Sequence, residues 1–298
     1  MVFLYHRQAY NDCRLSRRTS RYNCFMTTTT LKNHSKHAAS LLGPRDDAPF
    51  EVFNPDGRSP VLLVCDHASN HIPEGYDNLG LAAETLAENH IAWDIGAASV
   101  TRGLAHMFGS PAVLSCYSRL LIDCNRQPGA PDSIPAVSDN IAVLGNQNIS
   151  DREAERRLET FFWPYHHAIT NTLAQLWRHG PAPAVIAVHS FTPVFNGLRR
   201  PWDIGVLWNH DPRIARPLLH WLREHHDFCV GDNEPYSGRD VGFTLDHHAG
   251  AAGLPHICLE IRQDLIADEA GCKRWTAIVG EALEAVLSNA SLHNVEHY

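Results

Sequence analysis

Two histidines and one glutamate lie at or near the ends of apolar runs that are typical of buried strands. They are His67 after residues 61–65, His189 after residues 184–188, and Glu260 within residues 256–261. In open α/β sheets the carboxyl ends of the strands converge on the ligand crevice. A catalytic zinc takes about three His, Asp or Glu ligands and leaves one position for water. These positions therefore indicate a metal site with a general base beside it.

The chain has 20 histidines, so most of them serve as surface or structural residues, and His67 and His189 stand out only by following strands of one kind. Asp94 is the candidate for the third ligand, because an acid flanked by apolar residues is rarely buried without a partner such as a metal. Two alternatives stay open. Asp94 caps a helix that begins near Ile95, or Asn70, three residues after His67, takes the ligand position.

Two arginines flank the apolar run at residues 120–124. A guanidinium binds a carboxylate through two parallel hydrogen bonds, so Arg119 and Arg126 indicate a carboxylate-binding site, with Asn125 as a neutral donor beside it. The alternative is an internal ion pair with Asp123. The polar segment 231–238 either shapes a substrate pocket or forms a surface turn.

Other hydrolytic chemistries lack their usual motifs in this chain. There is no Gly-x-Ser-x-Gly elbow and no Cys-x-x-Cys pair. Four of the eight cysteines lie in or beside apolar runs, where a free cysteine behaves as a small hydrophobic residue. This pattern favours a reducing compartment, the cytoplasm.

The elements that must position these residues alternate between strands and helices. The expected strands are residues 50–54, 60–65, 111–116, 120–124, 184–188, 204–208 and 256–261. The expected helices are residues 82–107 with an interruption near 89–94, 150–178 with Ser150 as its cap, 216–226 and 267–289. Residues 127–148 are expected to form a long loop over the site. The alternation predicts a single α/β domain with a mixed, mostly parallel central sheet.

Charge divides the chain into a basic arm and an acidic body. Residues 1–45 carry eight Lys/Arg and one acid, which leaves 17 Lys/Arg and 32 Asp/Glu for residues 46–298. An acidic body disfavours nucleic acid as a partner, and no apolar run approaches the roughly 20 residues that span a bilayer. The arm is interpreted as a disordered extension, with a targeting peptide or translation from an upstream start before Met26 as alternatives. Residues 46–298 are expected to form the catalytic domain.

Taken together, the motifs resemble those of the N-formylglutamate amidohydrolase family. The matching segments are residues 66–73, 92–97, 118–126, 189–193, 231–238 and 253–264, which occur in order within roughly residues 50–290. The resemblance implies a three-layer sandwich of the phosphorylase/hydrolase type, distantly related to the zinc carboxypeptidases. It also implies hydrolysis of an N-acyl amide on an acidic amino acid, with N-formylglutamate giving formate and glutamate.

The resemblance also implies a role for each site residue. A divalent metal, preferably zinc, would be held by His67, Asp94 and His189. Glu260 would act as general base and acid. The residues expected to contact substrate are Arg119, which is also expected to assist catalysis, Asn125, Arg126, Tyr236 and His248.

One departure from the carboxypeptidases concerns the second ligand, because their His-x-x-Glu pair reads His67-Ala68-Ser69-Asn70 here. Iron, cobalt and manganese also suit two histidines and a carboxylate. Hydrolysis of another N-acyl amino acid or a peptide-like amide is one alternative function. A non-catalytic protein that binds acidic ligands is the other.

Overall fold

The computed structural model describes residues 41–43 and 48–298. The expectation for the basic arm at residues 1–45 therefore lies outside the described residues, except for 41–43. Within the described part of the chain, no helix is long and apolar enough to cross a membrane.

Seven strands in residues 48–298 form one mixed sheet in the order β1-β3-β2-β6-β11-β9-β10. Their bounds are β1 Phe50–Phe53, β2 Val61–Cys65, β3 Ala112–Ser115, β6 Ala184–Phe191, β9 Ile204–Leu207, β10 Val230–Asp232 and β11 His256–Arg262. The central strands β3, β2, β6 and β11 run parallel to one another. Strand β1 pairs antiparallel with β3 and β9 pairs antiparallel with β11, whereas β10 runs parallel to β9. The mixed, mostly parallel sheet expected from the sequence is confirmed.

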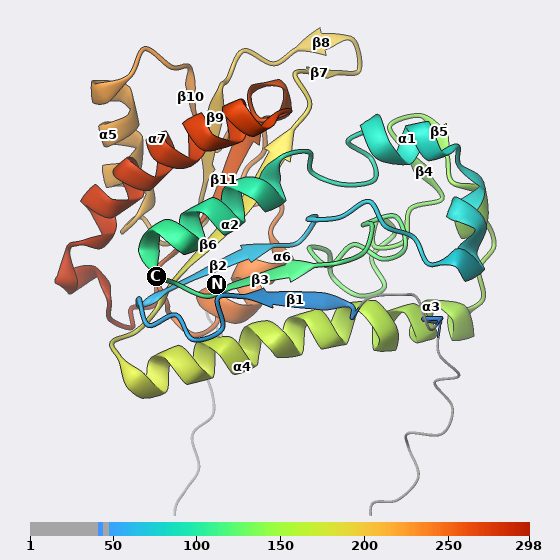
Figure 1. Ribbon diagram of the computed structural model, residues 1–298, viewed down its shortest axis with the longest axis horizontal. Coiled ribbons are helices and arrows are strands. Elements are labelled where there is room, and N and C mark those ends of the chain that lie inside the picture. Colours follow the sequence, from blue (N-terminus) through green and yellow to red (C-terminus); the bar gives the residue numbers. More distant parts are fainter. Residues whose placement is uncertain (1–40, 44–47) are drawn as a thin grey trace, which may run out of the picture. The chain divides into compact units, whose positions relative to one another are not determined.

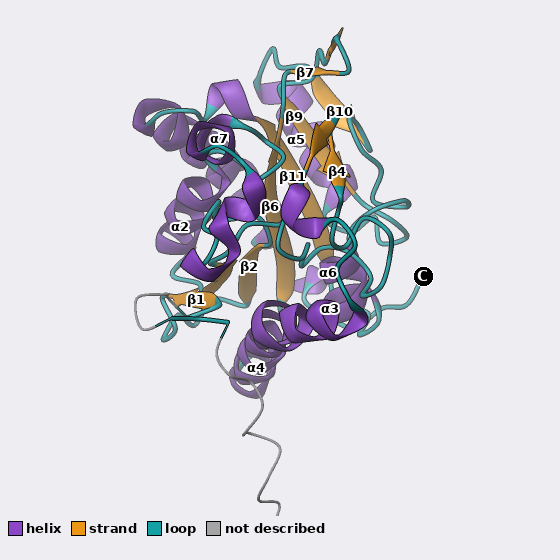
Figure 2. Ribbon diagram, turned by 90° about the vertical axis from the view of Figure 1, so that its right-hand side faces the viewer, coloured by secondary structure: helices purple, strands orange, loops and turns teal. Residues whose placement is uncertain are grey.

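Helices cover both faces of this sheet (Figures 1 and 2). One face carries α2 (Ala97–Phe108), α5 (Ala215–His225) and α7 (Glu269–Leu287), and the other carries α4 (Trp163–His179). Along β2, Leu63 and Cys65 belong to the apolar cluster of the first face, whereas Leu62 and Val64 belong to that of the second. Strands buried on both faces need apolar residues at every position, which accounts for the unbroken apolar runs. The result is a three-layer sandwich.

Shorter elements join these layers. The remaining α-helices are α1 Ala83–Glu88, α3 Asp151–Arg157 and α6 Phe243–Leu245, and π-helical turns cover Leu158–Phe162 and Asp246–Gly250. The 3-10 segments are Glu74–Gly80, Leu144–Asn146, Gln263–Leu265 and Ala290–Leu292. Ser150 caps α3 as expected, because its Oγ accepts a hydrogen bond from the Glu153 N–H at 3.2 Å.

Two small hairpins extend the loops beyond the sheet. They pair β4 (Val137–Ser138) with β5 (Ile141–Ala142), and β7 (Val194–Phe195) with β8 (Leu198–Arg199). In each, both turn residues have positive φ, as at Asn196 (49°) and Gly197 (75°). Such turns match the twist of the flanking strands. The first hairpin lies within the long loop expected at residues 127–148, and the second was not expected.

The strand predicted at residues 120–124 is wrong. This segment is a buried turn, although its residues Leu120, Leu121 and Ile122 are as apolar as those of a buried strand. Ser118 Oγ accepts a hydrogen bond from the Leu120 N–H at 3.2 Å, and Asp123 Oδ1 accepts one from the Asn125 N–H at 2.8 Å. Short polar side chains that bond to nearby backbone in this way compete with the hydrogen bonds of a sheet.

Candidate active site

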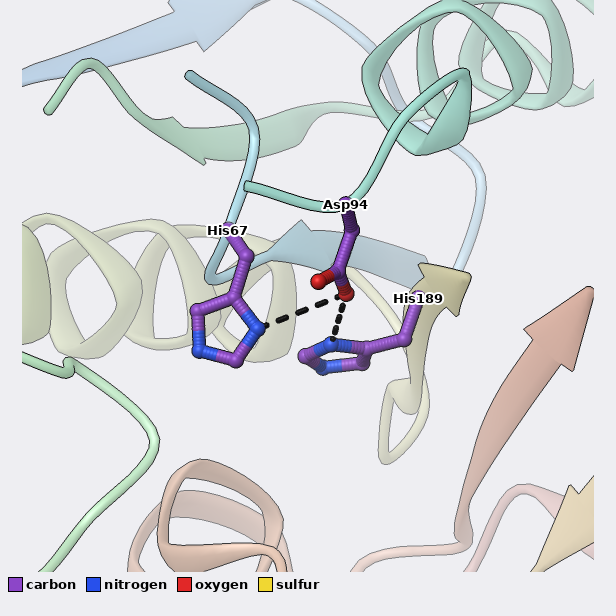
Figure 3. A group of neighbouring side chains, drawn as sticks. All are labelled: His67, Asp94 and His189. Carbon is purple, nitrogen blue, oxygen red and sulfur yellow. Dashed lines mark hydrogen bonds and ion pairs between the residues drawn. The ribbon is translucent and has the colours of Figure 1, made fainter. Parts of the chain in front are cut away.

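His67, Asp94 and His189 come together at the carboxyl ends of β2 and β6. His67 lies two residues beyond β2, His189 lies within β6, and Asp94 belongs to the segment between α1 and α2. The Asp94 Oδ2 atom is 3.3 Å from His67 Nδ1 and 2.8 Å from His189 Nδ1 (Figure 3). One ligand atom from each residue lies within 4.8 Å of the other two, and all three side chains are buried. The sequence therefore identified a group of side chains that the fold assembles.

The structure contradicts the alternative in which Asp94 caps a helix. Helix α2 begins after Gly96 and has no side-chain cap, whereas the Asp94 carboxylate accepts a hydrogen bond from the Ser190 N–H at 3.3 Å. Gly96 has a φ of 80° and lies so close to the Ile266 carbonyl that a side chain would collide with it. Asn70 lies outside the cluster and donates to the Leu86 carbonyl oxygen at 3.0 Å.

Two further carboxylates contact the Nε2 atoms of the imidazole rings. The Nε2 atom of His67 is 2.7 Å from Asp123 Oδ1, and that of His189 is 3.0 Å from Asp66 Oδ2. Asp66 Oδ1 accepts hydrogen bonds from the hydroxyls of Tyr165 and Thr244, at 2.9 and 2.6 Å. Histidines that ligate metals usually donate their second ring nitrogen to such a carboxylate, which fixes the ring orientation.

With its imidazoles neutral, as they would be when bound to a metal, the cluster carries a net negative charge. The carboxylates of Asp66, Asp94, Asp123 and Glu260 are all less than a tenth exposed. Among the described residues, the permanent cation in contact with them is Arg119, whose Nη2 is 2.6 Å from Asp123 Oδ2 and whose Nη1 is 3.6 Å from Asp94 Oδ1. Buried charges require compensation, so a divalent cation suits both this charge and the donor set of two imidazole nitrogens and one carboxylate oxygen.

The ionisation of the group follows from these contacts. Burial lowers the pKa of a histidine, yet the hydrogen bonds and charges of Asp66 and Asp94 raise the pKa of His189 well above its ordinary value. Burial raises the pKa of a carboxyl group, yet His67 and His189 bring that of Asp94 below its ordinary range. A bound cation would compete with protons for the imidazole nitrogens that face Asp94.

Glu260 lies beside the cluster with one oxygen unpaired. On β11 it stands in register with His189 on β6, and its buried Oε2 has no hydrogen-bond partner among the described residues. Burial raises the pKa of Glu260 to about 7, where nearby His189 opposes the shift and Asp94 reinforces it. A carboxyl group that titrates near neutral pH is suited to take and return a proton.

These side chains face one cavity of about 350 Å³. The predicted site residues that line it are His67, Asp94, Arg119, Asn125, Arg126, His189, Tyr236 and Glu260. A volume of this size accommodates a small organic molecule.

The predicted carboxylate-binding residues differ in what they already contact. Arg119 forms the internal pair with Asp123 that was the alternative interpretation. The Nε atom of Arg126 donates to Asp132 at 2.6 Å. Asn125 accepts a hydrogen bond from the Thr244 N–H at 3.0 Å through its Oδ1, so its amide N–H groups remain as donors on the cavity wall.

Segment 231–238 lines the cavity through Tyr236 and is not simply a surface turn. Asn233 Oδ1 accepts hydrogen bonds from the backbone N–H groups of Trp208 and Gly238, at 2.9 and 3.0 Å. Gly205 lies against the Glu234 carbonyl oxygen, where a Cβ atom would collide with it. Close backbone contact therefore fixes the position of Tyr236.

His248 is not brought to the cavity lining. Its Nε2 is 2.8 Å from His166 Nδ1, and the two rings stack with their planes 17° apart. His166 Nε2 donates to the Cys124 carbonyl oxygen at 2.9 Å. His166, whose role the sequence left undecided, is thereby part of a buried pair of imidazoles.

Sequence reasoning assigned no role to Asp66 or to Arg200. Asp66 follows a buried apolar run directly, and the same rule that selected His67 applies to it. Arg200 returns to the end of β6 through the β7–β8 hairpin, where its backbone N–H donates to the Pro193 carbonyl at 2.9 Å. The Asn196-Gly197 pair, a strong hairpin signal, would have predicted this return.

An α/β sandwich that gathers two histidines, an aspartate and a buried glutamate in one cavity beside the ends of its strands has the layout of a hydrolase. The model of the N-formylglutamate amidohydrolase family matches residues 59–267. The chain belongs to this family.

Solved structures show the same fold. The gene product Atu2144 from Agrobacterium tumefaciens is 35% identical, with a TM-score of 0.81 over 85% of this chain and 100% of its own. The N-formylglutamate amidohydrolase from Ralstonia eutropha JMP134 is 18% identical, with a TM-score of 0.60 over 82% of this chain and 99% of its own. No match was found among curated proteins.

Proposed function

We propose that this chain is a metal-dependent amidohydrolase that removes the acyl group from an acidic N-acyl amino acid, with N-formylglutamate as its substrate and formate and glutamate as products. Membership of the family supports the reaction class. The observation that carries the proposal is the unpaired, buried Glu260 carboxyl beside the His67–Asp94–His189 group.

The three clustered residues are proposed to hold a divalent metal, preferably zinc. When bound, such an ion polarises a carbonyl oxygen and lowers the pKa of water towards neutrality. Asp66 and Asp123 orient the two imidazoles, since each carboxylate occupies the Nε2 side of one ring.

Glu260 is proposed to move the proton. Its carboxylate takes a proton from the attacking water and returns it to the amide nitrogen, so that the amine leaves in neutral form. The raised pKa supports this role, because a group with a pKa of about 7 exchanges protons readily at neutral pH.

Substrate binding is proposed for the residues on the remaining walls. Asn125 and Arg126 are adjacent donors suited to a carboxylate, and Tyr236 offers a phenol hydroxyl from its constrained loop. Arg119 is proposed to assist the reaction, because its charge keeps the Asp123 carboxylate beside His67 ionised. The same charge is proposed to attract the substrate.

The cysteines of the described chain are free thiols, which supports a reducing compartment such as the cytoplasm.

Replacement of the proposed base tests this mechanism. Glu260→Gln should reduce formate release from N-formylglutamate by at least about 100-fold, the lower range for general base catalysis. Its metal content should stay that of the wild type, because Glu260 is not one of the proposed ligands. Glu281→Gln, an exposed change on α7, is the matched control and should keep full activity. Wild-type turnover in Glu260→Gln would remove Glu260 from this role.

A further inference from the structure

Arg200 is a buried cation without an acidic partner. It is only 9% exposed, and its guanidinium forms no ion pair within the described residues. By contrast, the buried guanidinium of Arg157 lies 3.1 Å from a Glu153 oxygen. Arginines are rarely buried unless they are paired. Arg200 therefore points to an anion that the described chain does not supply.

The position of Arg200 relates this anion to the cavity. Its guanidinium carbon lies 4.7 Å from the ring centre of Phe195, 4.8 Å from that of Tyr236 and 5.8 Å from that of Phe191. These three rings line the cavity that contains Glu260. Aromatic faces attract a cation, but they carry no net negative charge. A positive charge thus stands directly behind one wall of the cavity.

Tyr236 connects this charge to the cavity. Arg200 Nη1 donates a hydrogen bond to Tyr236 Oη at 2.9 Å, so the phenol must use its own hydrogen as a donor to another group. The Tyr236 hydroxyl donates no hydrogen bond of its own within the described part of the chain. Burial raises the pKa of Tyr236, which keeps the hydroxyl protonated. The hydroxyl is therefore available to an acceptor in the cavity.

The other two cavity arginines are already compensated by aspartates. Arg119 contacts Asp123, and Arg126 contacts Asp132. Of these three arginines, Arg200 is therefore the one whose positive charge lacks a counterion within the described residues.

We infer that Arg200 is a positioning residue for acid specificity, which orients the Tyr236 hydroxyl towards the side-chain carboxylate of the substrate and supplies the positive charge behind it. This inference rests on the proposed function, because it concerns the same substrate. It adds that the acidic side chain, and not only the amino acid's own carboxylate, is selected.

The test compares two substrates of equal size, N-formyl-L-glutamate and N-formyl-L-glutamine, which keeps the α-carboxylate but has a neutral side chain. Arg200→Met should lower kcat/KM for the glutamate derivative about 10–100-fold, the value of a hydrogen bond to a charged group, mainly through KM. The loss for the glutamine derivative should be several-fold smaller, so that the preference for the acid falls. Arg199→Met removes the same charge from an exposed neighbour and should leave the preference unchanged.

Two more variants separate a relay from general damage. If Arg200 acts through Tyr236, the double variant Arg200→Met/Tyr236→Phe should lose little more acid preference than the more affected single variant. Arg200→Lys should recover part of the preference, because it restores the charge without the planar fork. An equal loss of kcat/KM for both substrates in Arg200→Met, which leaves the preference for the acid unchanged, would overturn the inference.

Failure of the proposed function gives a different pattern. If the wild type hydrolyses neither derivative, that function is wrong, and calorimetric binding of L-glutamate and L-glutamine then tests Arg200. A wild-type preference for glutamate that Arg200→Met abolishes supports the inference. The same preference in both proteins, or none in the wild type, contradicts it.

Discussion

At the scale of single residues, the site depends on which carboxylate each imidazole nitrogen faces. The Nε2 atoms of His67 and His189 face Asp123 and Asp66, and their Nδ1 atoms face Asp94. This division leaves both Nδ1 atoms on the side of Asp94, the proposed third ligand. The two outer aspartates thus belong to the proposed metal site although they offer it no ligand atom in this arrangement.

Asp66→Asn should weaken metal binding by about 10–100-fold, the usual effect of losing a carboxylate behind a ligating histidine. An amide holds the His189 ring less strongly than a carboxylate and leaves that imidazole less basic. The affinity is measured by competition with a chromophoric chelator. Asp227→Asn, an exposed change outside the site, is the control, and equal affinities in the two variants would argue against a role for Asp66.

The site residues at strand ends could be predicted because the rule depends only on sequence order. His67, His189 and Glu260 follow or lie in apolar runs, and their strands proved to be neighbours in the sheet. The partners of these residues could not be predicted in the same way, because Asp123 reaches His67 across 56 residues and Asp66 reaches His189 across 123. His248, expected at the substrate from a motif, instead pairs with His166.

At the scale of elements, loop 233–238 is held in place by close backbone contact with two strands. Gly205 of β9 and Gly231 of β10 both lie against the Glu234 carbonyl oxygen. A glycine in a strand often marks such an approach of another backbone. The loop carries Tyr236, so the packing of these strands determines one wall of the cavity.

Gly205→Ala should displace this loop. The added Cβ would collide with a backbone atom, which cannot rotate away, so the free energy of unfolding should fall by about 1–3 kcal/mol. A misplacement of about 1 Å can reduce catalysis roughly 100-fold, and kcat/KM should fall accordingly. Both are measured against Gly75→Ala, where a Cβ meets no atom within 4 Å. Wild-type stability and activity in Gly205→Ala would show that the loop tolerates the displacement.

The contact between α4 and the π-helical turn Asp246–Gly250 contains the buried imidazole pair. Burial, together with the charges of neighbouring imidazoles, lowers the pKa of His166 to about 4 and that of His248 to about 3. In the unfolded chain a histidine titrates near 6.5. The folded state therefore binds protons less readily than the unfolded state, and the stability present above pH 6.5 is lost as the pH falls towards 4 and 3.

His248→Gln should remove about half of this acid sensitivity, because one of the two imidazoles is lost. The free energy of unfolding of the wild type should decrease by on the order of 1–3 kcal/mol for each imidazole between pH 7 and pH 4.5. Urea denaturation at both pH values measures the difference. His220→Gln, on the exposed side of α5, should behave as the wild type, and an equally large acid loss in His248→Gln would contradict the assignment.

The elements themselves were predictable where one kind of signal dominated. Apolar runs identified β2, β6 and β11, unbroken in β2 and in the first five residues of β6, because those strands are buried on both faces. Residues 120–124 carry the same signal but form a turn, since Ser118 and Asp123 satisfy nearby backbone N–H groups. A short apolar run cannot by itself distinguish a strand from another buried segment.

At the scale of the whole molecule, the excess of acidic residues over basic ones reaches into the core. Residues 46–298 hold 32 Asp/Glu and 17 Lys/Arg, and four carboxylates are buried around the proposed metal site. A ligand that binds the folded state alone stabilises it in proportion to the logarithm of its concentration over Kd. Metal binding should therefore raise the stability of the entire domain as well as permit the reaction.

The most direct test of the account is the activity of the wild-type chain before and after metal removal. Chelation followed by dialysis should abolish formate release from N-formylglutamate and lower the Tm. Addition of zinc in stages should restore activity in proportion to the metal bound, up to one ion per chain, the content expected for one His67–Asp94–His189 group. Full hydrolysis by protein that metal analysis shows to be free of metal would contradict the central claim.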